Sequence, residues 1–306
     1  MVKAHTPTPP LPAGDTERTS PRFSGIDAWE PRDALDAMIE AQFAAVAAVR
    51  SARGAIEQAT RALEARLGGR GRLVYAGAGT SGRLAIQDGA ELMPTFNWPS
   101  ERLVMLIAGG QKALVQAVEG AEDETAKAAE LIERHEVGAG DGLIAVAASG
   151  TTPFTVACLR VARRRGALTI GIANNPGTPL LEEAEHAILL DTGPEPIAGS
   201  TRMKAGTAQR IALNLISSLL IIRLGRVYQG LMVDVQATNI KLARRREAIV
   251  HRLTGRGEQE VREALARADG NVKLAVLLVD GCELAAAKAL LDRAGGRLGA
   301  ARHGQP

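Results

Sequence analysis

The sequence has few aromatic residues, cysteines and histidines, and each shortage narrows what the protein can be. Aromatic residues make up 3% of the 306 residues and hydrophobic residues 46%, so the core must be aliphatic and rich in alanine. Cys158 and Cys282 lie far apart in expected helices, which favours small buried thiols in a reducing compartment over a disulfide. The histidines are His5, His135, His186, His251 and His303. None of them has the paired spacing of metal ligands, so we expect no metal site.

The chain also lacks a large charge of one sign and a long uninterrupted apolar segment. Its net charge of +3 does not favour a nucleic acid partner. The longest apolar run, Ile211–Ile222, contains an asparagine and two serines, so we expect a core or dimer-interface helix and no membrane span. Met1–Arg22 holds five prolines and no apolar segment typical of a secretory signal, which predicts a disordered tail and a cytoplasmic protein.

Short apolar segments alternate with helical segments through the middle of the chain. The strand candidates are Leu73–Ala76, Leu103–Ile107, Leu143–Ala147, Leu168–Ile172 and Ala187–Leu190. Helical stretches such as Glu122–His135 and Pro153–Arg165 fall between them. This alternation predicts an α/β fold with a doubly wound five-stranded parallel sheet. Ligands of such sheets bind beyond the carboxyl ends of the strands, where every motif described below falls.

Helical segments flank the predicted sheet at both ends of the sequence. Apolar residues at helical spacing predict one or two helices over Asp33–Leu67, and a long helix is expected over Ser200–Gly225 with Ser200 as its N-cap. The last part of the chain is expected to form short helices over Lys241–Arg252, Glu258–Arg267, Val272–Val279 and Leu284–Arg293. We therefore expect a disordered Pro-rich tail over 1–24, an α/β domain with its N-terminal helices over 25–240, and a small helical domain over 241–306.

A glycine-rich turn between the first strand and the next helix is the most informative motif. The sequence RLVYAGAGTSGRLAIQDGAE, Arg72–Glu91, places Thr80 and Ser81 between glycines that include Gly79. Such a turn directs backbone N–H groups, hydroxyls and the positive end of a helix at one spot, which suits a phosphate. Glu91 follows two to three turns later, where we expect that helix to end. A phosphate anchor followed by a carboxylate indicates acid/base chemistry on a phosphorylated small molecule.

The same glycines also fit another pattern. Gly77-x-Gly79-x-x-Gly82 matches the dinucleotide fingerprint, which requires an acid at the end of the next strand for the ribose hydroxyl. The strand candidate Leu103–Ile107 is followed by Ala-Gly-Gly-Gln and by no acid. A nicotinamide cofactor is therefore disfavoured, and we expect no cofactor. The alternative to a phosphate site is a tight turn that binds no ligand.

A second hydroxyl turn follows the third predicted strand. It reads Ser149-Gly150-Thr151-Thr152-Pro153, and proline suits the first turn of the helix that follows. Taken alone, this turn could be an ordinary helix cap. Beside the first turn at a neighbouring strand end, it predicts that Ser149, Gly150 and Thr152 complete the phosphate site.

Acidic residues cluster after the second predicted strand. They are Glu119, Glu122, Asp123 and Glu124. Acids at the start of a helix interact favourably with its dipole, so a solvated helix start is one explanation. The other is that one of them joins Glu91 at a sugar-sized pocket, where two carboxylates can divide the roles of acid and base. The spacing of these acids does not choose among them.

These motifs resemble those of a known family. The two hydroxyl turns resemble sugar isomerase (SIS) domains, which bind phosphosugars, and the chain as a whole resembles the N-acetylmuramic acid 6-phosphate etherases. The matching stretches are GAGTSGR (Gly77–Arg83), PTF (Pro94–Phe96), IAGG (Ile107–Gly110), AVEGAED (Ala117–Asp123), GSTRMKAGTAQ (Gly199–Gln209) and LMVDVQATNIKL (Leu231–Leu242). The resemblance runs from about Arg72 to Leu242 and is weaker in the C-terminal helices.

The resemblance implies an activity and the residues that perform it. The family cleaves a D-lactyl ether by elimination and water addition, releasing D-lactate and N-acetylglucosamine 6-phosphate, as one step of cell-wall amino sugar recycling. It implies Glu91 as the proton donor to the leaving lactate and Glu122 as the base at C2, with Ser200 and Lys204 as further candidate site residues. It also implies a homodimer. The alternatives are a phosphosugar-sensing regulatory protein without catalysis and a phosphosugar isomerase.

Overall fold

The computed structural model describes residues 14–235 and 240–304 and contains the expected parallel sheet. Its strands are β1 (Leu73–Gly77), β2 (Leu103–Ile107), β3 (Gly142–Val146), β4 (Leu168–Ala173) and β5 (His186–Leu189). They pair in parallel in the order β2-β1-β3-β4-β5, which confirms the predicted doubly wound fold. The direction in which successive strands are added to the sheet reverses at β1, because β2 lies on one side of β1 and β3 on the other. A ligand crevice is expected at the carboxyl ends of these strands.

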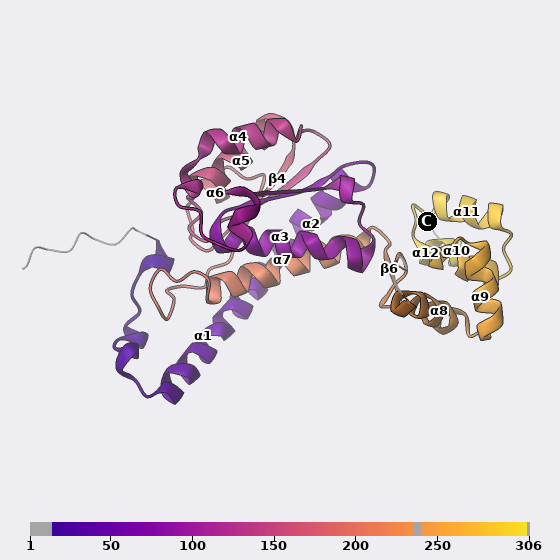
Figure 1. Cartoon of the computed structure of the whole chain (residues 1–306), viewed down its shortest axis with the longest axis horizontal. Helices are drawn as coiled ribbons and strands as arrows, with labels where there is room; N and C mark the ends of the chain where they lie inside the picture. Colours follow the sequence, from indigo (N-terminus) through magenta and orange to yellow (C-terminus); the bar gives the residue numbers. More distant parts are fainter. Residues whose placement is uncertain (1–13, 236–239, 305–306) are drawn as a thin grey trace, which may run out of the picture.

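Helices cover both faces of the sheet because alternate strand residues point to opposite faces. Leu73 and Tyr75 of β1 pack with α2 (Arg53–Leu67), α3 (Gly79–Phe96) and α7 (Lys204–Arg223) in one aliphatic core. Val74 and Ala76 face a second core on the other side. The helices of that side are α4 (Thr125–Arg134), α5 (Pro153–Arg164) and the short α6 (Pro179–Glu182). Figure 1 shows these two helical layers above and below the strands.

The N-terminal helix α1 (Pro31–Ser51) packs against α7 and projects beyond the α/β domain (Figure 1). Its buried face is built from alanines and Val49, which allow a close approach to α7. The opposite side of the helix carries large apolar side chains that are at least half exposed: Leu35 54%, Ile39 52%, Phe43 70% and Val46 55%. Monomeric soluble proteins rarely expose such a continuous apolar surface, so this stripe indicates a contact surface.

Residues 14–24 differ from the expected disordered tail. They include two 3-10 turns, η1 (Asp15–Glu17) and η2 (Pro21–Phe23), and a third turn, η3 (Ile26–Ala28), follows. Thr16 is fully buried. Its backbone N–H donates to Asn175 Oδ1 at 3.2 Å, and Asn175 Nδ2 donates to the Thr16 hydroxyl at 3.0 Å. The prediction of disorder is therefore wrong for 14–24, and residues 1–13 lie outside the described residues.

The long helix α7 begins later than expected and is capped differently. It starts at Lys204, and the residue before it is Met203, so Ser200 is not its N-cap. The backbone N–H groups of Lys204 and Ala205 donate to the buried carboxylate of Glu195 at 3.1 and 2.8 Å. In the part of the chain that the structure describes, α7 is also the one helix long and apolar enough to cross a membrane. It packs against α1, α2 and α3, as a core helix does.

The C-terminal part forms a helical bundle at one end of the α/β domain (Figure 1). Its helices are α8 (Ile240–Thr254), α9 (Glu258–Arg267), α10 (Val272–Val279), α11 (Leu284–Arg293) and α12 (Leu298–His303). A short hairpin of β6 (Val227–Tyr228) and β7 (Leu231–Met232) precedes them. The sequence did not indicate α12 or the hairpin. Arg226 ties this region to the α/β domain by donating to the carbonyls of Phe96 and Asn97 at 2.9 and 2.8 Å.

Candidate functional site

A cavity of about 390 Å³ lies at the carboxyl ends of β1, β2 and β3. This is the place that the strand order predicts for a ligand. The polar side chains on its wall are Glu17, Thr80, Ser81, Arg83, Glu122, Ser149, Thr152 and Thr201. Its remaining wall is formed by Gly79 and by small apolar residues, which are mainly alanines. The cavity is therefore polar, close to the size of a monosaccharide phosphate, and lined by two carboxylates.

The start of α3 forms one end of the cavity wall. The first helical bond of this end joins the Gly82 N–H to the Ala78 carbonyl at 2.9 Å, so the N–H groups of Gly79, Thr80 and Ser81 have no acceptor within the helix. Gly79 has a φ of +52°, which a residue with a side chain rarely adopts. The glycine turn thus aims free donors and the positive end of the helix dipole into the cavity, as phosphate binding requires.

The second hydroxyl turn contributes two of its three expected residues to the cavity. The hydroxyls of Ser149 and Thr152 lie 3.2 Å apart on the wall. Gly150 is not on the wall. Its φ is +72°, and a Cβ at this position would lie 2.2 Å from the hydroxyl oxygen of Thr178, so glycine is needed there for the turn and its packing.

Arg83 is a wall residue that the sequence analysis did not single out. Its Nε donates to the carbonyl of Ala113 at 2.7 Å. Ala113 belongs to η5 (Gly110–Leu114), so this bond fastens the segment after β2 to the start of α3. The only sequence signal for this role was the position of Arg83 directly after the glycine turn.

Glu122 lies in the cavity on the 3-10 turn η6 (Ala121–Asp123), before α4 and not within it. Its Oε1 atom is 2.8 Å from the point that a Cβ of residue 79 would occupy, so the carboxylate fits over Gly79 because that residue has no side chain. Among the described residues, no side chain or backbone group forms a hydrogen bond or ion pair with this carboxylate. Of the four clustered acids, it is the one that faces the phosphate turn.

Glu91 lies elsewhere. The expectation that its helix ends there is wrong, because α3 continues through Pro94 to Phe96 and is closed by Asn97 in the left-handed region. Glu91 is twelve positions after Gly79, which corresponds to about 18 Å along the helix. Glu91 is exposed and absent from the cavity wall. Within one chain, Glu91 and Glu122 therefore do not face the same ligand.

The two further candidates, Ser200 and Lys204, are also off the wall, and Thr201 between them is on it. Lys204 is almost completely buried, with 6% of its surface exposed. Burial lowers its pKa, and the nearby carboxylate of Glu195 acts in the opposite direction. Lys204 is thus part of the buried start of α7 and not of the cavity wall.

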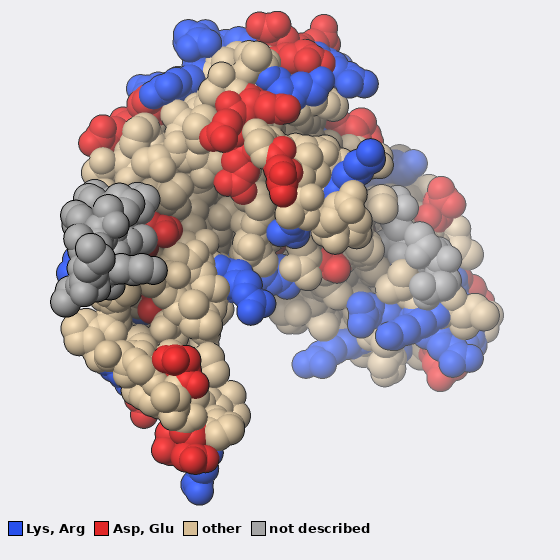
Figure 2. Space-filling model, turned by 60° about the vertical axis from the view of Figure 1, so that its left-hand side comes forward, with Lys and Arg blue, Asp and Glu red and all other residues tan. Residues whose placement is uncertain are grey.

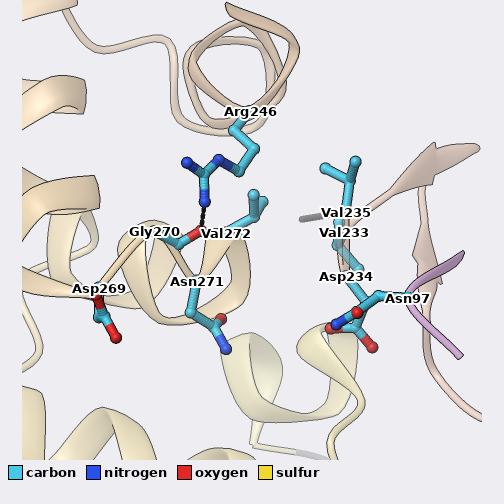
Figure 3. A pocket seen from close by; sticks show the side chains of 9 residues that line it. All are labelled: Asn97, Val233, Asp234, Val235, Arg246, Asp269, Gly270, Asn271 and Val272. Carbon is cyan, nitrogen blue, oxygen red and sulfur yellow. Dashed lines mark hydrogen bonds between the residues drawn. The ribbon is translucent and has the colours of Figure 1, made fainter. Parts of the chain in front are cut away.

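A second cavity, of about 290 Å³, lies between the hairpin and the helical bundle (Figure 3). Two of its three charged side chains have partners: Asp234 pairs with Lys273 at 2.9 Å, and Arg246 donates to the Gly270 carbonyl at 3.0 Å, the bond drawn in Figure 3. The start of α10 also lines it, but the side chain of its N-cap Asn271 already accepts a hydrogen bond from the Leu274 N–H at 3.0 Å. The polar cavity at the strand ends is the better candidate for chemistry.

The described residues contain no group of three or more histidine, cysteine, aspartate or glutamate side chains that could hold a metal ion. Figure 2 shows that one face of the molecule is hollowed and that basic side chains lie inside the hollow, with acidic ones above it. Basic side chains in a hollow raise the local concentration of anions.

Family models identify the domain class of the chain. Residues 112–219 match the SIS domain, and residues 55–163 match the glucokinase regulatory protein N-terminal SIS domain. Together the two matches cover all five strands of the sheet and every residue of the cavity wall except Glu17.

Full-length relatives define the family. An N-acetylmuramic acid 6-phosphate etherase of Deinococcus radiodurans is 49% identical over 284 residues, which cover 92% of each chain. The etherase of Streptomyces avermitilis is 42% identical over 95% of this chain and 94% of its own. The etherase of Edwardsiella ictaluri is 42% identical over 92% of this chain and 95% of its own. The chain belongs to the N-acetylmuramic acid 6-phosphate etherase family.

Proposed function

We propose that the protein cleaves the D-lactyl ether of N-acetylmuramic acid 6-phosphate, giving N-acetylglucosamine 6-phosphate and D-lactate. The observation that carries the proposal is the Glu122 carboxylate, which lies beside the start of α3 without a protein partner among the described residues. A base next to a phosphate site can act on the sugar attached to that phosphate. The etherases that are 42–49% identical over nearly their whole length support the choice of substrate.

The proposed reaction is a carbon–oxygen lyase reaction followed by addition of water. The open-chain aldehyde of the sugar acidifies the hydrogen at C2, Glu122 removes it, and the lactate oxygen leaves from C3. Water then adds to the unsaturated aldehyde at C3. These steps need proton transfers at a positioned carboxylate, which contribute typically 10²–10⁴-fold to a rate. Ser81, Ser149 and Thr152 would hold the phosphate at the opposite end of the sugar.

The proposed role of Glu91 requires a second copy of the chain. Glu91 is about 18 Å from the phosphate turn along its own helix, so it cannot protonate a sugar held there. As the proton donor for the leaving lactate, it would have to reach the cavity of a partner subunit.

Exposed apolar side chains support a homodimer. Besides the stripe on α1, Met93 of α3 is 55% exposed, and Leu215 and Ile222 of α7 are 45% and 51% exposed. Met93 and Glu91 lie near the same end of α3, although residues two positions apart point to different sides of a helix. Burial of such a surface at roughly 25 cal/mol per Å² is the usual driving force for a stable dimer.

A lactate assay tests the proposal against its alternatives. Purified protein is incubated with N-acetylmuramic acid 6-phosphate, and D-lactate and N-acetylglucosamine 6-phosphate are quantified together. The etherase reaction gives the two products in equal amounts. An isomerase would rearrange the sugar without releasing lactate, and a sensor would bind the substrate without turnover. Absence of lactate from a folded, phosphosugar-binding protein would overturn the proposal.

A further inference from the structure

The N-terminal segment reaches the cavity from outside the sheet. Three hydrogen bonds hold it there: two join Thr16 and Asn175 at 3.2 and 3.0 Å, and the Gly199 N–H donates to the Thr16 carbonyl at 3.0 Å. Asn175 follows β4, and Gly199 precedes α7. Thr16 is therefore bonded to two separate parts of the α/β domain, and from there the segment leads away from the domain to the start of α1 (Figure 1).

This anchoring places Glu17 on the cavity wall, together with Glu122 and the phosphate-binding hydroxyls. The Glu17 carboxylate has no hydrogen bond or ion pair to any described residue, although its neighbour Asp15 pairs with Arg18 at 2.6 Å. Glu17 Oε2 is 2.9 Å from the point that a Cβ of Gly199 would occupy. Gly199 has a φ of +75°, so the wall at this point is a bare backbone turn that leaves room for the carboxylate.

The two carboxylates enter the cavity from opposite sides. Glu122 comes from the segment after β2, and Glu17 follows Thr16, which is bonded to Asn175 after β4, with β1 and β3 between them in the sheet. The phosphate-binding turns follow β1 and β3, so they lie between the carboxylates. A sugar whose phosphate is bound there has one face toward each. Neither carboxylate has a donor among the described residues, so both can accept hydrogen bonds from the hydroxyl groups of a sugar.

We propose that Glu17 is a substrate-binding residue that accepts hydrogen bonds from hydroxyl groups of the sugar, opposite the proposed base Glu122. The inference deepens the proposed function and rests on it. It assigns Glu17 to recognition of the sugar and not to proton transfer. A carboxylate repels phosphate, so Glu17 makes the site selective for a phosphate that carries a hydroxylated sugar over phosphate alone.

Three variants test this role. E17Q keeps an acceptor oxygen and removes the charge, E17A removes both, and D15N alters an acid of the same turn that is not on the cavity wall. Calorimetry measures the affinity of each for N-acetylglucosamine 6-phosphate and for inorganic phosphate, and steady-state assays measure kcat and KM for lactate release. Thermal unfolding compares their stability with that of the wild type.

Loss of hydrogen bonds to a charged acceptor lowers affinity by about ten- to a hundredfold. We expect E17A to lose this much affinity for the sugar phosphate and none for inorganic phosphate, E17Q to lose less, and D15N to match the wild type. KM should rise more than kcat falls. Wild-type affinity in E17A, or an equal loss for both ligands, would overturn the inference. A wild-type protein that binds no sugar phosphate would instead refute the proposed function.

Discussion

At the scale of single residues, Glu122 is the group on which the proposed chemistry depends. We predict that E122Q releases lactate about a hundred- to ten-thousandfold more slowly than the wild type, because an amide cannot remove the C2 proton. It should also lose exchange of the C2 hydrogen with deuterated water, which mass spectrometry detects. E119Q is the matched control, since Glu119 is in the same acidic cluster and off the cavity wall. Normal exchange in E122Q would show that another group is the base.

The hydroxyls of Ser81 and Ser149 test the phosphate site, because both are on the wall beside a helix start. We predict that S81A and S149A each weaken phosphosugar binding by roughly 1.5–3 kcal/mol, the usual contribution of a hydrogen bond to a charged group. The loss should nearly disappear for the unphosphorylated sugar. S100A, in the 3-10 turn η4 (Ser100–Arg102), is the control. If calorimetry finds the same loss for both sugars, the phosphate binds elsewhere.

At the scale of elements, an ion pair joins the starts of two central strands. Arg72 precedes β1, and its Nε and Nη2 atoms donate to the Asp141 carboxylate at 3.0 and 2.7 Å. Burial acts to raise the pKa of Asp141, but the hydrogen bonds from Arg72 and the Gly138 N–H outweigh it, so the net pKa is lowered. We predict that D141N costs about 1.5–3 kcal/mol of unfolding free energy at neutral pH.

The pH dependence of this pair has a definite sign. The pKa of Asp141 is lower in the folded protein than in the unfolded chain. The carboxylate therefore contributes fully to the free energy of unfolding above its unfolded pKa of 3.8, and this contribution is lost as pH falls through its folded pKa. Denaturant unfolding at several pH values should therefore show the gap between wild type and D141N closing below pH about 4. A gap that stays constant in acid would exclude the carboxylate as its source.

At the scale of the whole molecule, the exposed stripe of α1 predicts the oligomeric state. Phe43 is the most exposed residue of that stripe, at 70%. We predict that F43D converts a dimer to a folded monomer, since a charge in an apolar interface remains without a partner. D36A, on the same helix, is the control. Light scattering gives the mass, and a monomeric wild type would refute the dimer.

Mixing two inactive variants tests whether Glu91 serves a partner. If each site uses Glu122 of one chain and Glu91 of the other, E91Q and E122Q are both inactive alone. Random mixed dimers would then contain one site with neither change, which restores about a quarter of wild-type activity. No recovery after verified subunit exchange would mean that the two glutamates do not act across a dimer.

Much of the fold could be predicted from the sequence because its signals are local. The five strands, the helical stretch Asp33–Leu67 and most C-terminal helices follow from the spacing of apolar residues and from glycines that end elements, and the structure has them. The glycine-rich turn at the start of α3 could also be predicted, because Gly79, Thr80 and Ser81 are neighbours in the chain. Stretches such as AVEGAED and GSTRMKAGTAQ indicate the family, and they can be recognised from the sequence without coordinates.

Only the tertiary structure decided which groups share the cavity. Thr16 finds its partner Asn175 159 positions away, so no local pattern reveals that the N-terminal segment is ordered or that Glu17 reaches the site. Glu195 caps α7 from outside the helix, where the sequence offered Ser200. Glu122 lies inside a stretch that resembles the family and Glu91 lies just before another, but the length of α3 separates them within one chain. Sequence specifies local conformation, whereas proximity between distant segments depends on how the whole chain packs.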